Sequence, residues 1–356
     1  MHVVLLGGAG YIGTVAAPRL VSLGMQVTVV DGLVYRRAED PRCLLPSACR
    51  FIHADLRDPD VLSEALAGAD AVVHMGGLVG EPACAVDERL SVELNFSSPV
   101  MAAHTALACG VPHYVLFSSC SVYGRHEETV TEDTEPRPLG VYARTKALAE
   151  RHVTHVLRDQ ADVTTLRLAT VHGASPRQRL DSVVNRMAAQ AAARGRVPLN
   201  GGSQRRPLVH VADVAAVLAA VLERPAGRRT LNVGSDRENH TIRRIAETVA
   251  ELVPGTVIDV GPERDEADAR DYRTSFARLG AFAPDTCTTP LTTGVSEIAE
   301  ALATRQITDP DHPEYDNLKG LRLRHATGRL RALKSPELNR LHDLYARATV
   351  DGDRGR

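Results

Sequence analysis

The sequence predicts a doubly wound α/β fold, and two observations lead to that prediction. Apolar runs of strand length recur through the first half of the chain at 2–6, 26–30, 50–53, 71–74, 113–117 and 163–168. Amphipathic stretches of helix length separate them at 15–23, 59–67, 87–109 and 141–157. Strands that alternate with crossover helices form a parallel sheet with helices on both faces. We therefore expect such a sheet in the first half.

The pattern loosens beyond residue 168, which indicates a smaller, discontinuous α/β lobe that faces the substrate. A helix is expected near 180–193, and another helix and strand near 241–253 and 256–260. We predict a first domain over 1–168 to which 207–235 return, a substrate-binding lobe from 169–206 and 236–303, and a tail over 304–356. The tail is polar and Arg-rich with few apolar anchors, and a helix is expected near 337–347.

The amino-acid composition disfavours several classes of protein. The 356 residues carry 42 Lys+Arg against 44 Asp+Glu, for a formal net charge of -2, so a general nucleic-acid-binding role is disfavoured. The six cysteines include no Cys-x-x-Cys pair and are expected to be reduced thiols. No apolar run reaches about 18 residues, the length of a membrane span. We expect a cytoplasmic protein with neither a membrane span nor a metal site.

A glycine-rich turn follows the first predicted strand and opens a helix. Gly7, Gly10 and Gly13 have the spacing of a dinucleotide-binding fingerprint. The first glycine makes the tight turn, the second lets a pyrophosphate approach the backbone, and the third allows the helix to pack closely on the strand. The helix N-terminus offers unpaired N–H groups to the phosphates. This motif predicts a Rossmann-like domain.

Asp31 ends the second predicted strand, about 20 residues after the glycine turn. A carboxylate at this position accepts hydrogen bonds from the adenosine ribose hydroxyls, which favours NAD as the cofactor. Arg36 and Arg37 keep NADP open, because a guanidinium there can pair with a 2′-phosphate. At the ends of the third and fourth strands, Asp55 lies where it can face the adenine, and Gly76 and Gly77 leave room for a ligand.

Tyr142 and Lys146 are four residues apart in a predicted helix, so they share one face of it. An ammonium beside a phenol stabilises the phenolate, and such a tyrosine can remove a hydroxyl proton while hydride leaves the same carbon. The serine-rich segment 118–124 ends the fifth predicted strand just before this helix. Together with the glycine fingerprint, the pair predicts an oxidoreductase step on a carbinol carbon.

On these motifs, the chain resembles an extended short-chain dehydrogenase/reductase of the nucleotide-sugar epimerase/dehydratase family over about residues 1 to 300. The resemblance implies a NAD cofactor, a nucleotide-diphosphate sugar as substrate, and a homodimer built on the helices at 87–109 and 141–157. It implies catalytic roles for Ser119, Tyr142 and Lys146. Ser119 is expected to bond the reacting sugar hydroxyl, Tyr142 to act as base or acid, and Lys146 to hold the nicotinamide ribose and tune Tyr142.

The resemblance also implies two sets of binding residues. The cofactor contacts are Gly7, Gly10, Tyr11, Ile12, Gly13, Asp31, Gly32, Leu33, Asp55, Leu56, Met75, Gly76, Gly77, Asn95, Ser118, Tyr142, Lys146 and Thr170. The substrate contacts are Leu78, Ser119, Cys120, Arg177, Asn185, Arg206 and Arg270. The arginines of the second set are expected on the nucleotide diphosphate, because planar guanidinium groups suit its oxygens.

Residues Cys120 and Ser121 bear on which reaction is catalysed. In the family's 4,6-dehydratases an Asp-Glu pair follows the catalytic Ser or Thr, and here Cys120 and Ser121 stand in its place. A serine cannot act as that base without help, so ordinary dehydration is disfavoured. We predict C4 epimerisation through a transient 4-keto sugar. A NAD(P)H-dependent 4-ketoreductase, a dehydratase of unusual mechanism with Cys120 as acid, and a non-catalytic dinucleotide sensor stay as alternatives.

Overall fold

A seven-stranded parallel sheet organises the first lobe, in the order β11-β7-β5-β4-β1-β2-β3. The structure is a computed structural model that describes residues 1–35, 41–225, 227–261, 271–328, 330–333 and 335–354. The strands are β1 (His2–Leu6), β2 (Gln26–Asp31), β3 (Arg50–His53), β4 (Ala71–His74), β5 (His113–Ser119), β7 (Asp162–Leu168) and β11 (Arg228–Val233). The chain starts at β1 and winds outward in both directions, so the predicted doubly wound fold is confirmed.

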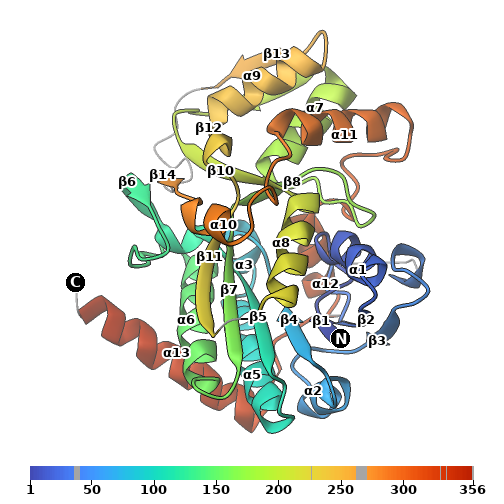
Figure 1. Cartoon of the computed structure of the whole chain (residues 1–356). Coiled ribbons are helices and arrows are strands. Elements are labelled where there is room, and N and C mark those ends of the chain that lie inside the picture. The colour runs from blue at the N-terminus through green and yellow to red at the C-terminus, as the bar shows by residue number, and fades with distance from the viewer. Residues whose placement is uncertain (36–40, 226, 262–270, 329, 334, 355–356) are drawn as a thin grey trace.

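Helices cover both faces of this sheet (Figure 1). The helices α1 (Gly13–Ser22) and α8 (Val211–Glu223) pack on one face, and α2 (Pro59–Leu66), α5 (Ser98–Ala108) and α6 (Val141–Val156) pack on the other. Side chains alternate between the faces along each strand: Val3 and Leu5 join the first core, whereas Val4 and Leu6 join the second. Burial on both faces explains why the strands read as continuous apolar runs.

The predicted helix at 87–109 is divided into three parts. It consists of α4 (Glu88–Val92), a π-helical turn η2 (Glu93–Ser97) and α5. All five side chains of the π turn are buried, including the polar Glu93 and Asn95. Because π turns inside helices are rare and tend to occur at functional sites, this one marks the helix as part of the pocket's support.

The second lobe is assembled from separate stretches of the chain. Three helices surround one apolar core: α7 (Val183–Arg194), α9 (Ile242–Leu252) and α11 (Leu291–Ala303). One small sheet pairs β9 (Arg196–Leu199) with β13 (Val257–Val260). The other has the order β12 (Asn239–Thr241), β10 (Arg205–His210) and β8 (Thr170–His172). Of the stretch 207–235, α8 and β11 return to the first lobe, whereas β10 pairs with β8 and β12.

Several short elements complete the structure. They are α3 (Glu81–Cys84), α10 (Ala277–Phe282), the 3-10 turns η1 (Pro41–Leu44), η3 (Cys120–Tyr123) and η4 (Asp236–Glu238), and the strand pair β6 (Arg125–Val130) and β14 (Asp271–Thr274).

Each of the six cysteines is free, as expected for reduced thiols. Among the described residues, no helix combines the length and apolar character needed to cross a membrane.

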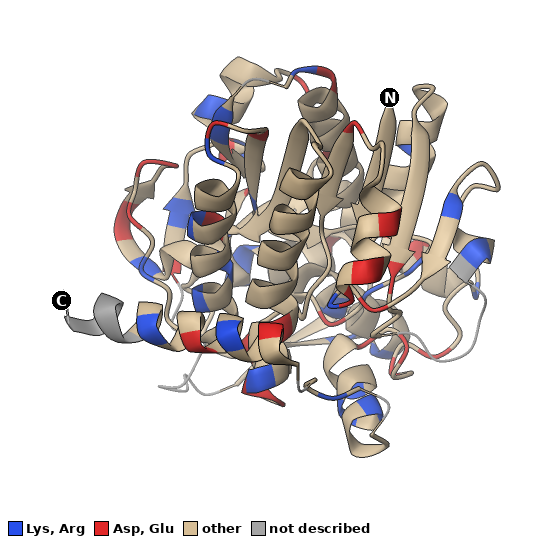
Figure 2. Cartoon of the chain, turned by 90° about the horizontal axis from the view of Figure 1, so that it is seen from below, with Lys and Arg blue, Asp and Glu red and all other residues tan. Residues whose placement is uncertain are grey.

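The C-terminal segment (residues 304–354) is anchored on the rest of the molecule, contrary to the expected polar tail with few apolar anchors. It contains α12 (Asn317–Ala326) and α13 (Pro336–Arg354). Leu338 and Tyr345 of α13 are buried against the core around α5, and Tyr345 contacts the ring of Phe96 in η2 at a centroid distance of 5.6 Å. In Figures 1 and 2, α13 crosses the side of the molecule formed by α5 and α6.

Candidate active site

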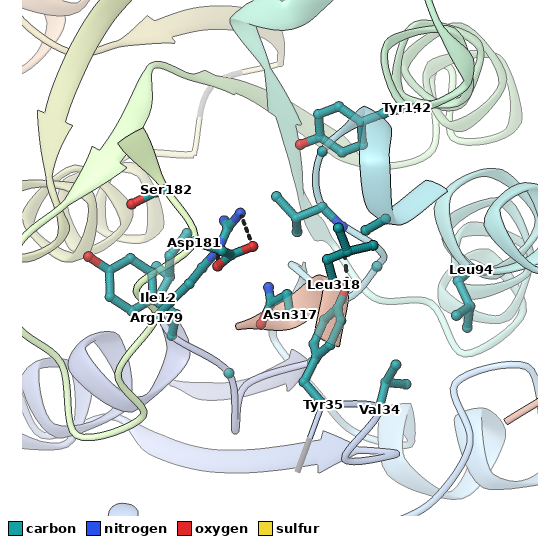
Figure 3. A pocket seen from close by; sticks show the side chains of 18 of the residues that line it. Ile12, Val34, Tyr35, Leu94, Tyr142, Arg179, Asp181, Ser182, Asn317 and Leu318 are labelled. Carbon is teal, nitrogen blue, oxygen red and sulfur yellow. Dashed lines mark hydrogen bonds and ion pairs between the residues drawn. The ribbon is translucent and has the colours of Figure 1, made fainter. Parts of the chain in front are cut away.

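A large cavity lies between the two lobes, at the carboxyl ends of β1, β2, β4 and β5, and has a volume of about 1170 Å³. Ligands of open α/β sheets bind at this edge. A pocket for one small molecule has a volume of roughly 300–1,000 Å³, so this cavity is larger than a pocket of that kind. Figure 3 shows side chains from both lobes and from the C-terminal segment pointing into it.

The glycine turn after β1 forms the floor of the cavity. Gly7 has a φ of +84°, and a Cβ on Gly7 or Gly13 would overlap the backbone of Gly76 or Gly8. A Cβ on Gly10 would meet only the carbonyl oxygen of Gly7 at 3.5 Å, so the backbone at Gly10 is open toward the cavity. These are the steric conditions that a bound pyrophosphate requires. The turn therefore fits a dinucleotide, with the N-terminus of α1 directed at the phosphates.

Asp31 is held at the end of β2 by two backbone donors. Its Oδ2 accepts from Ala9 N at 2.9 Å and its Oδ1 from Leu33 N at 2.7 Å. Burial raises the pKa of the Asp31 carboxyl, and the two backbone hydrogen bonds oppose that rise. Each oxygen keeps a lone pair for a ribose hydroxyl, and a negative carboxylate repels a 2′-phosphate. The site therefore fits NAD, while Arg36 and Arg37 lie outside the described residues.

Most of the predicted cofactor contacts line this cavity. They are Gly7, Gly10, Tyr11, Ile12, Gly13, Asp31, Gly32, Leu33, Asp55, Leu56, Met75, Gly76, Gly77, Tyr142, Lys146 and Thr170. Asp55 is engaged by a neighbour in a way that could not be read from the sequence: its carboxylate pairs with the Arg57 guanidinium at 2.6 Å. The helix cap at this place is Asp58, whose side chain accepts from Asp60 N and Val61 N.

Three predicted contacts lie behind the cavity wall, and here the prediction is corrected. Asn95 bonds both backbone groups of Leu78, with Oδ1 accepting from the nitrogen at 2.7 Å and Nδ2 donating to the oxygen at 3.0 Å. Leu78 is fully buried in an apolar cluster. Asn95 thus shapes the turn after β4 without facing a ligand. Ser118 is also buried, and its hydroxyl donates to the Glu150 carboxylate on the far side of the strand.

The predicted catalytic residues meet at one end of the cavity. Ser119 at the end of β5 and Tyr142 and Lys146 on α6 all line it. Lys146 Nζ donates to the carbonyl oxygen of Phe117 at 3.0 Å, which fixes the ammonium beside the strand end. Burial lowers the pKa of Lys146 to about 8. The Ser119 hydroxyl donates to Ser121 Oγ at 3.1 Å and accepts from the Ser121 backbone nitrogen.

Glu81 positions Tyr142, a role that no motif in the sequence indicated. The helix α6 begins after Gly140, which has no side chain to cap it. The Glu81 carboxylate from α3 instead accepts from the backbone nitrogens of Tyr142 at 3.1 Å and Ala143 at 3.2 Å. A Cβ on Gly140 would overlap this carboxylate. An acidic group at a helix N-terminus is favoured by the helix dipole, so Glu81 stabilises the turn that carries Tyr142.

Cys120 does not line the cavity, contrary to its predicted place among the substrate contacts. Its side chain is buried, and its thiol donates to the carbonyl oxygen of Arg167 at 3.2 Å. Burial raises the pKa of the thiol far above its ordinary range. Cys120 therefore cannot serve as an acid or base toward a molecule in the cavity.

The second-lobe residues divide into two groups. Arg177 and Arg206 line the cavity and are largely buried, at 8% and 6% exposure. Asn185 does not line it: its amide binds the backbone of Gly173 and Arg179 and the Tyr11 hydroxyl, so it orders the loop after β8. Arg270 lies outside the described residues.

Arg179 and Asp181 line the cavity beside Ser182 and were not predicted from the sequence. Their side chains form an ion pair at 2.6 Å (Figure 3). The Asp181 carboxylate holds the Arg179 guanidinium in place and raises the pKa of its cation against the opposing effect of burial. One feature of the sequence could have indicated these two residues. Arg179 and Asp181 lie close to Arg177 in a segment with few apolar residues.

A dinucleotide groove that ends at a serine, a tyrosine and a lysine defines a dinucleotide-dependent enzyme that acts on a carbinol carbon. The model of the NAD dependent epimerase/dehydratase family matches residues 3–234. The chain belongs to this family. The predicted family and its NAD cofactor are thereby confirmed.

Named relatives agree with this assignment. The putative UDP-arabinose 4-epimerase 2 of Arabidopsis thaliana is 28% identical over 306 residues, which cover 76% of this chain and 71% of the relative. The UDP-glucose 4-epimerase of Azospirillum brasilense is 27% identical over 290 residues, or 73% of this chain and 81% of that one. Both relatives are named as 4-epimerases of UDP-sugars.

Solved structures are similar in fold as well. MoeE5, in complex with UDP-glucuronic acid and NAD, aligns with a TM-score of 0.75 and 28% identity over 86% of this chain and 100% of that chain. The UDP-glucose 4-epimerase of Thermus thermophilus, in complex with NAD, aligns with a TM-score of 0.74 and 26% identity over 86% and 100%. The predicted fold class is confirmed by both.

Proposed function

We propose that this protein is a NAD-dependent nucleotide-sugar 4-epimerase. The observation that carries the proposal is the set of groups beside the catalytic serine: Tyr142 and Lys146 line the cavity with Ser119, whereas Cys120 is turned away from it. This arrangement supplies one base at one carbinol carbon. The relatives named as UDP-sugar 4-epimerases support the same activity and a UDP-sugar as the substrate class.

The carboxylates of the cavity support epimerisation over dehydration. A dehydratase needs an acid and a base in addition to the tyrosine, to remove a C5 proton and protonate a leaving hydroxyl. Among the described residues that line the cavity, the carboxylates are Asp31, Asp55, Glu81 and Asp181. Asp31 and Glu81 accept from backbone nitrogens, and Asp55 and Asp181 are paired with arginines. Each of these carboxylates therefore already has a partner within the protein, which disfavours it as the additional acid or base of a dehydratase.

In the proposed mechanism, Tyr142 removes the proton of the C4 hydroxyl while Ser119 hydrogen-bonds the same oxygen. The Lys146 ammonium, held by the Phe117 carbonyl, stabilises the phenolate form of Tyr142. NAD, when bound, supplies the acceptor and later the donor of hydride at C4. The 4-keto sugar turns over in the cavity, and Tyr142 returns the proton to the other epimer. Arg179 and Arg206 bind the anionic diphosphate during both steps.

The test is a product assay without added cofactor. The purified chain is incubated with UDP-, dTDP- and GDP-hexoses and the products are followed by proton NMR, while denatured protein is analysed for released NAD. An epimerase converts one of these to its C4 epimer and releases about one NAD per chain. A product with a new methyl group would indicate a dehydratase. Protein that arrives empty and consumes NADPH with a 4-keto sugar would indicate a ketoreductase.

We further propose that the enzyme acts as a homodimer in the cytoplasm, which the family resemblance and the composition support. The helix α13 packs against η2 and α4, which belong to the region 87–109 where this dimer is expected to form. Light scattering on the purified chain tests the oligomeric state. A mass of twice 38.3 kDa is expected, and a mass of 38.3 kDa at micromolar concentration would exclude the dimer.

A further inference from the structure

The C-terminal segment forms part of the cavity wall. Asn317, Leu318, Arg324, Leu330, Arg331 and Leu333 line the cavity together with the cofactor-binding turns after β2 and β3. MoeE5 and the UDP-glucose 4-epimerase of Thermus thermophilus align over 100% of their length with 86% of this chain, so the rest of this chain has no aligned counterpart in them. The segment lies beyond the residues matched by the family model.

One anchor of the segment is a buried ionic group at the end of β3. The Arg57 guanidinium pairs with Glu93 of η2 at 2.7 Å, and both side chains are almost fully buried. Arg57 Nη1 also donates to the carbonyl oxygen of Arg331 at 3.1 Å, and Glu93 Oε2 accepts from Leu333 N at 2.9 Å. Buried charges that bind backbone groups hold those groups firmly, because breaking either contact leaves one backbone group and one atom of a buried ion without a hydrogen-bond partner.

A second anchor joins the segment to the other lobe. Leu180 N, in the loop that also carries Arg177 and Arg179, donates to the carbonyl oxygen of Tyr315 at 2.7 Å. On the inner side of α12, Leu321 packs in the apolar cluster that contains Tyr142. The segment therefore spans the cavity from the second lobe to the end of β3.

Two polar groups in this wall lack partners. Asn317 is 3% exposed and lines the cavity, and its Oδ1 has no hydrogen-bond partner among the described residues. Arg177 is 8% exposed, and its Nη2 likewise has no partner there. Leaving a buried polar atom without a partner costs about 1–3 kcal/mol, more for a charged group. Both residues line the cavity, and a small rotation of either side chain would bring its unpartnered atom to a ligand there.

Tyr35 places these two groups at the cofactor end of the cavity. The Arg177 guanidinium lies over the Tyr35 ring at 5.5 Å, and Arg177 N donates to Thr14 Oγ1 in the first turn of α1. A Cβ on Gly320 of α12 would lie 3.7 Å from the carbonyl oxygen of Tyr35. Figure 3 shows Asn317 and Leu318 above Tyr35 in the cavity. Tyr35 follows Asp31 by four residues. Arg177 and Asn317 therefore lie beside the part of the cavity that runs from the glycine turn, where the pyrophosphate is expected, to Asp31, where the adenosine ribose is expected.

We propose that the C-terminal segment completes the dinucleotide site. Asn317 Oδ1 accepts a hydrogen bond from the adenosine half of NAD, and Arg177 donates to its pyrophosphate. This inference rests on the proposed function, and it assigns Arg177 to the cofactor in place of the substrate. By covering the groove, the segment slows the loss of NAD, which suits an enzyme that reuses one cofactor molecule in every turnover.

The first experiment compares Asn317→Ala with Arg322→Ala, an exposed residue of the same helix. The NAD content after gel filtration and the dissociation constant for NAD are measured without any sugar nucleotide. Loss of one buried hydrogen bond is expected to raise the dissociation constant about 5- to 10-fold in Asn317→Ala and to leave it unchanged in Arg322→Ala. The KM for the sugar nucleotide at saturating NAD is expected to stay within about twofold.

Two results would overturn the inference. One is equal NAD affinity in the two variants, and the other is a raised KM for the sugar nucleotide with unchanged NAD affinity, which assigns Asn317 to the substrate. Hydrogen exchange of the unmodified chain covers the case in which Asn317→Ala does not fold. NAD is expected to slow exchange in residues 315–328 at least about tenfold, because contact with a ligand reduces local opening; no change there contradicts the proposal. The product assay fails or succeeds independently of these measurements.

Discussion

The two walls of the cavity are built in different ways. The first-lobe wall consists of short turns at the carboxyl ends of parallel strands, and glycine backbone forms much of its surface. The opposite wall comes from the loop after β8, from β10 and from the C-terminal segment, and it presents side chains such as Arg177, Arg179 and Arg206. The first wall is suited to hold the cofactor beside Tyr142, and we expect the second to determine which charged ligands bind. Changes in the first should lower kcat, and changes in the second should lower affinity.

The largest effect is expected at Lys146. Lys146→Met keeps the length of the side chain and removes the ammonium that we propose stabilises the Tyr142 phenolate, so kcat should fall by at least about 10²-fold. Steady-state kinetics at saturating NAD and sugar nucleotide measure it. Arg151→Ala, on the exposed side of the same helix, is the matched control. A variant that retains more than half of the parent kcat would show that the first wall does not carry the chemistry.

The buried ion pair that anchors the C-terminal segment should dominate its stability. Arg57→Met leaves the buried Glu93 carboxylate with only the partly exposed Arg89, at 3.2 Å, as a cationic partner, and should lower the free energy of unfolding by up to about 3–5 kcal/mol in urea titrations. Arg50 pairs with Glu64 at 3.1 Å on the surface, and Arg50→Met should cost less than about 1 kcal/mol. Equal losses in the two variants would mean that the anchor contributes no more than a surface pair.

Arg205 and Arg206 test the second wall, because they are neighbours on β10 with opposite exposure. Arg206 lines the cavity, whereas Arg205 faces solvent. Arg206→Ala should raise the KM for the sugar nucleotide by about 10- to 100-fold through the loss of charged hydrogen bonds, with kcat within a few-fold of the parent. Arg205→Ala should behave as the parent. A fall in kcat alone for Arg206→Ala would move this residue to the chemical step.

The smallest expected effect is a dependence of stability on pH. Burial lowers the pKa of His74 to about 3, of His113 to about 4 and of His172 to about 3. Below about pH 6.5 the unfolded chain takes up protons that the folded chain does not, so stability falls by up to about 1.4 kcal/mol per pH unit for each histidine. In urea titrations from pH 7 to 5, His172→Phe should flatten this slope, and His104→Phe, at an exposed position, should not. An unchanged slope in both would refute this assignment.

Local spacing made the first wall predictable. Gly7, Gly10 and Gly13 act through their own backbone, and Tyr142 and Lys146 share a helix face by geometry alone. The direction in which a site side chain points was harder to predict than the presence of that residue near the site. Asn95 was expected at the cofactor, but it supports the turn after β4, because a buried amide serves a backbone as readily as a ligand.

The second wall depends on contacts between distant segments, which a single sequence does not reveal. The apolar residues of α13 recur with helical spacing at Leu338, Leu341, Tyr345 and Ala348, so an amphipathic helix was readable. The surface of the first lobe that α13 covers could not be predicted from the sequence. The position of Asn317 in the cavity follows from anchors at Arg57 and Leu180, which lie more than a hundred residues earlier in the chain.

The most direct test of the account is the turnover of Tyr142→Phe. This variant removes one hydroxyl and keeps the ring in its packing, so the NAD content should equal that of the parent. The interconversion of C4 epimers should then fall by at least about 10³-fold, because the Tyr142 hydroxyl is the proposed acid and base for the C4 oxygen. A variant that loads NAD and interconverts the epimers as fast as the parent would contradict the proposed mechanism.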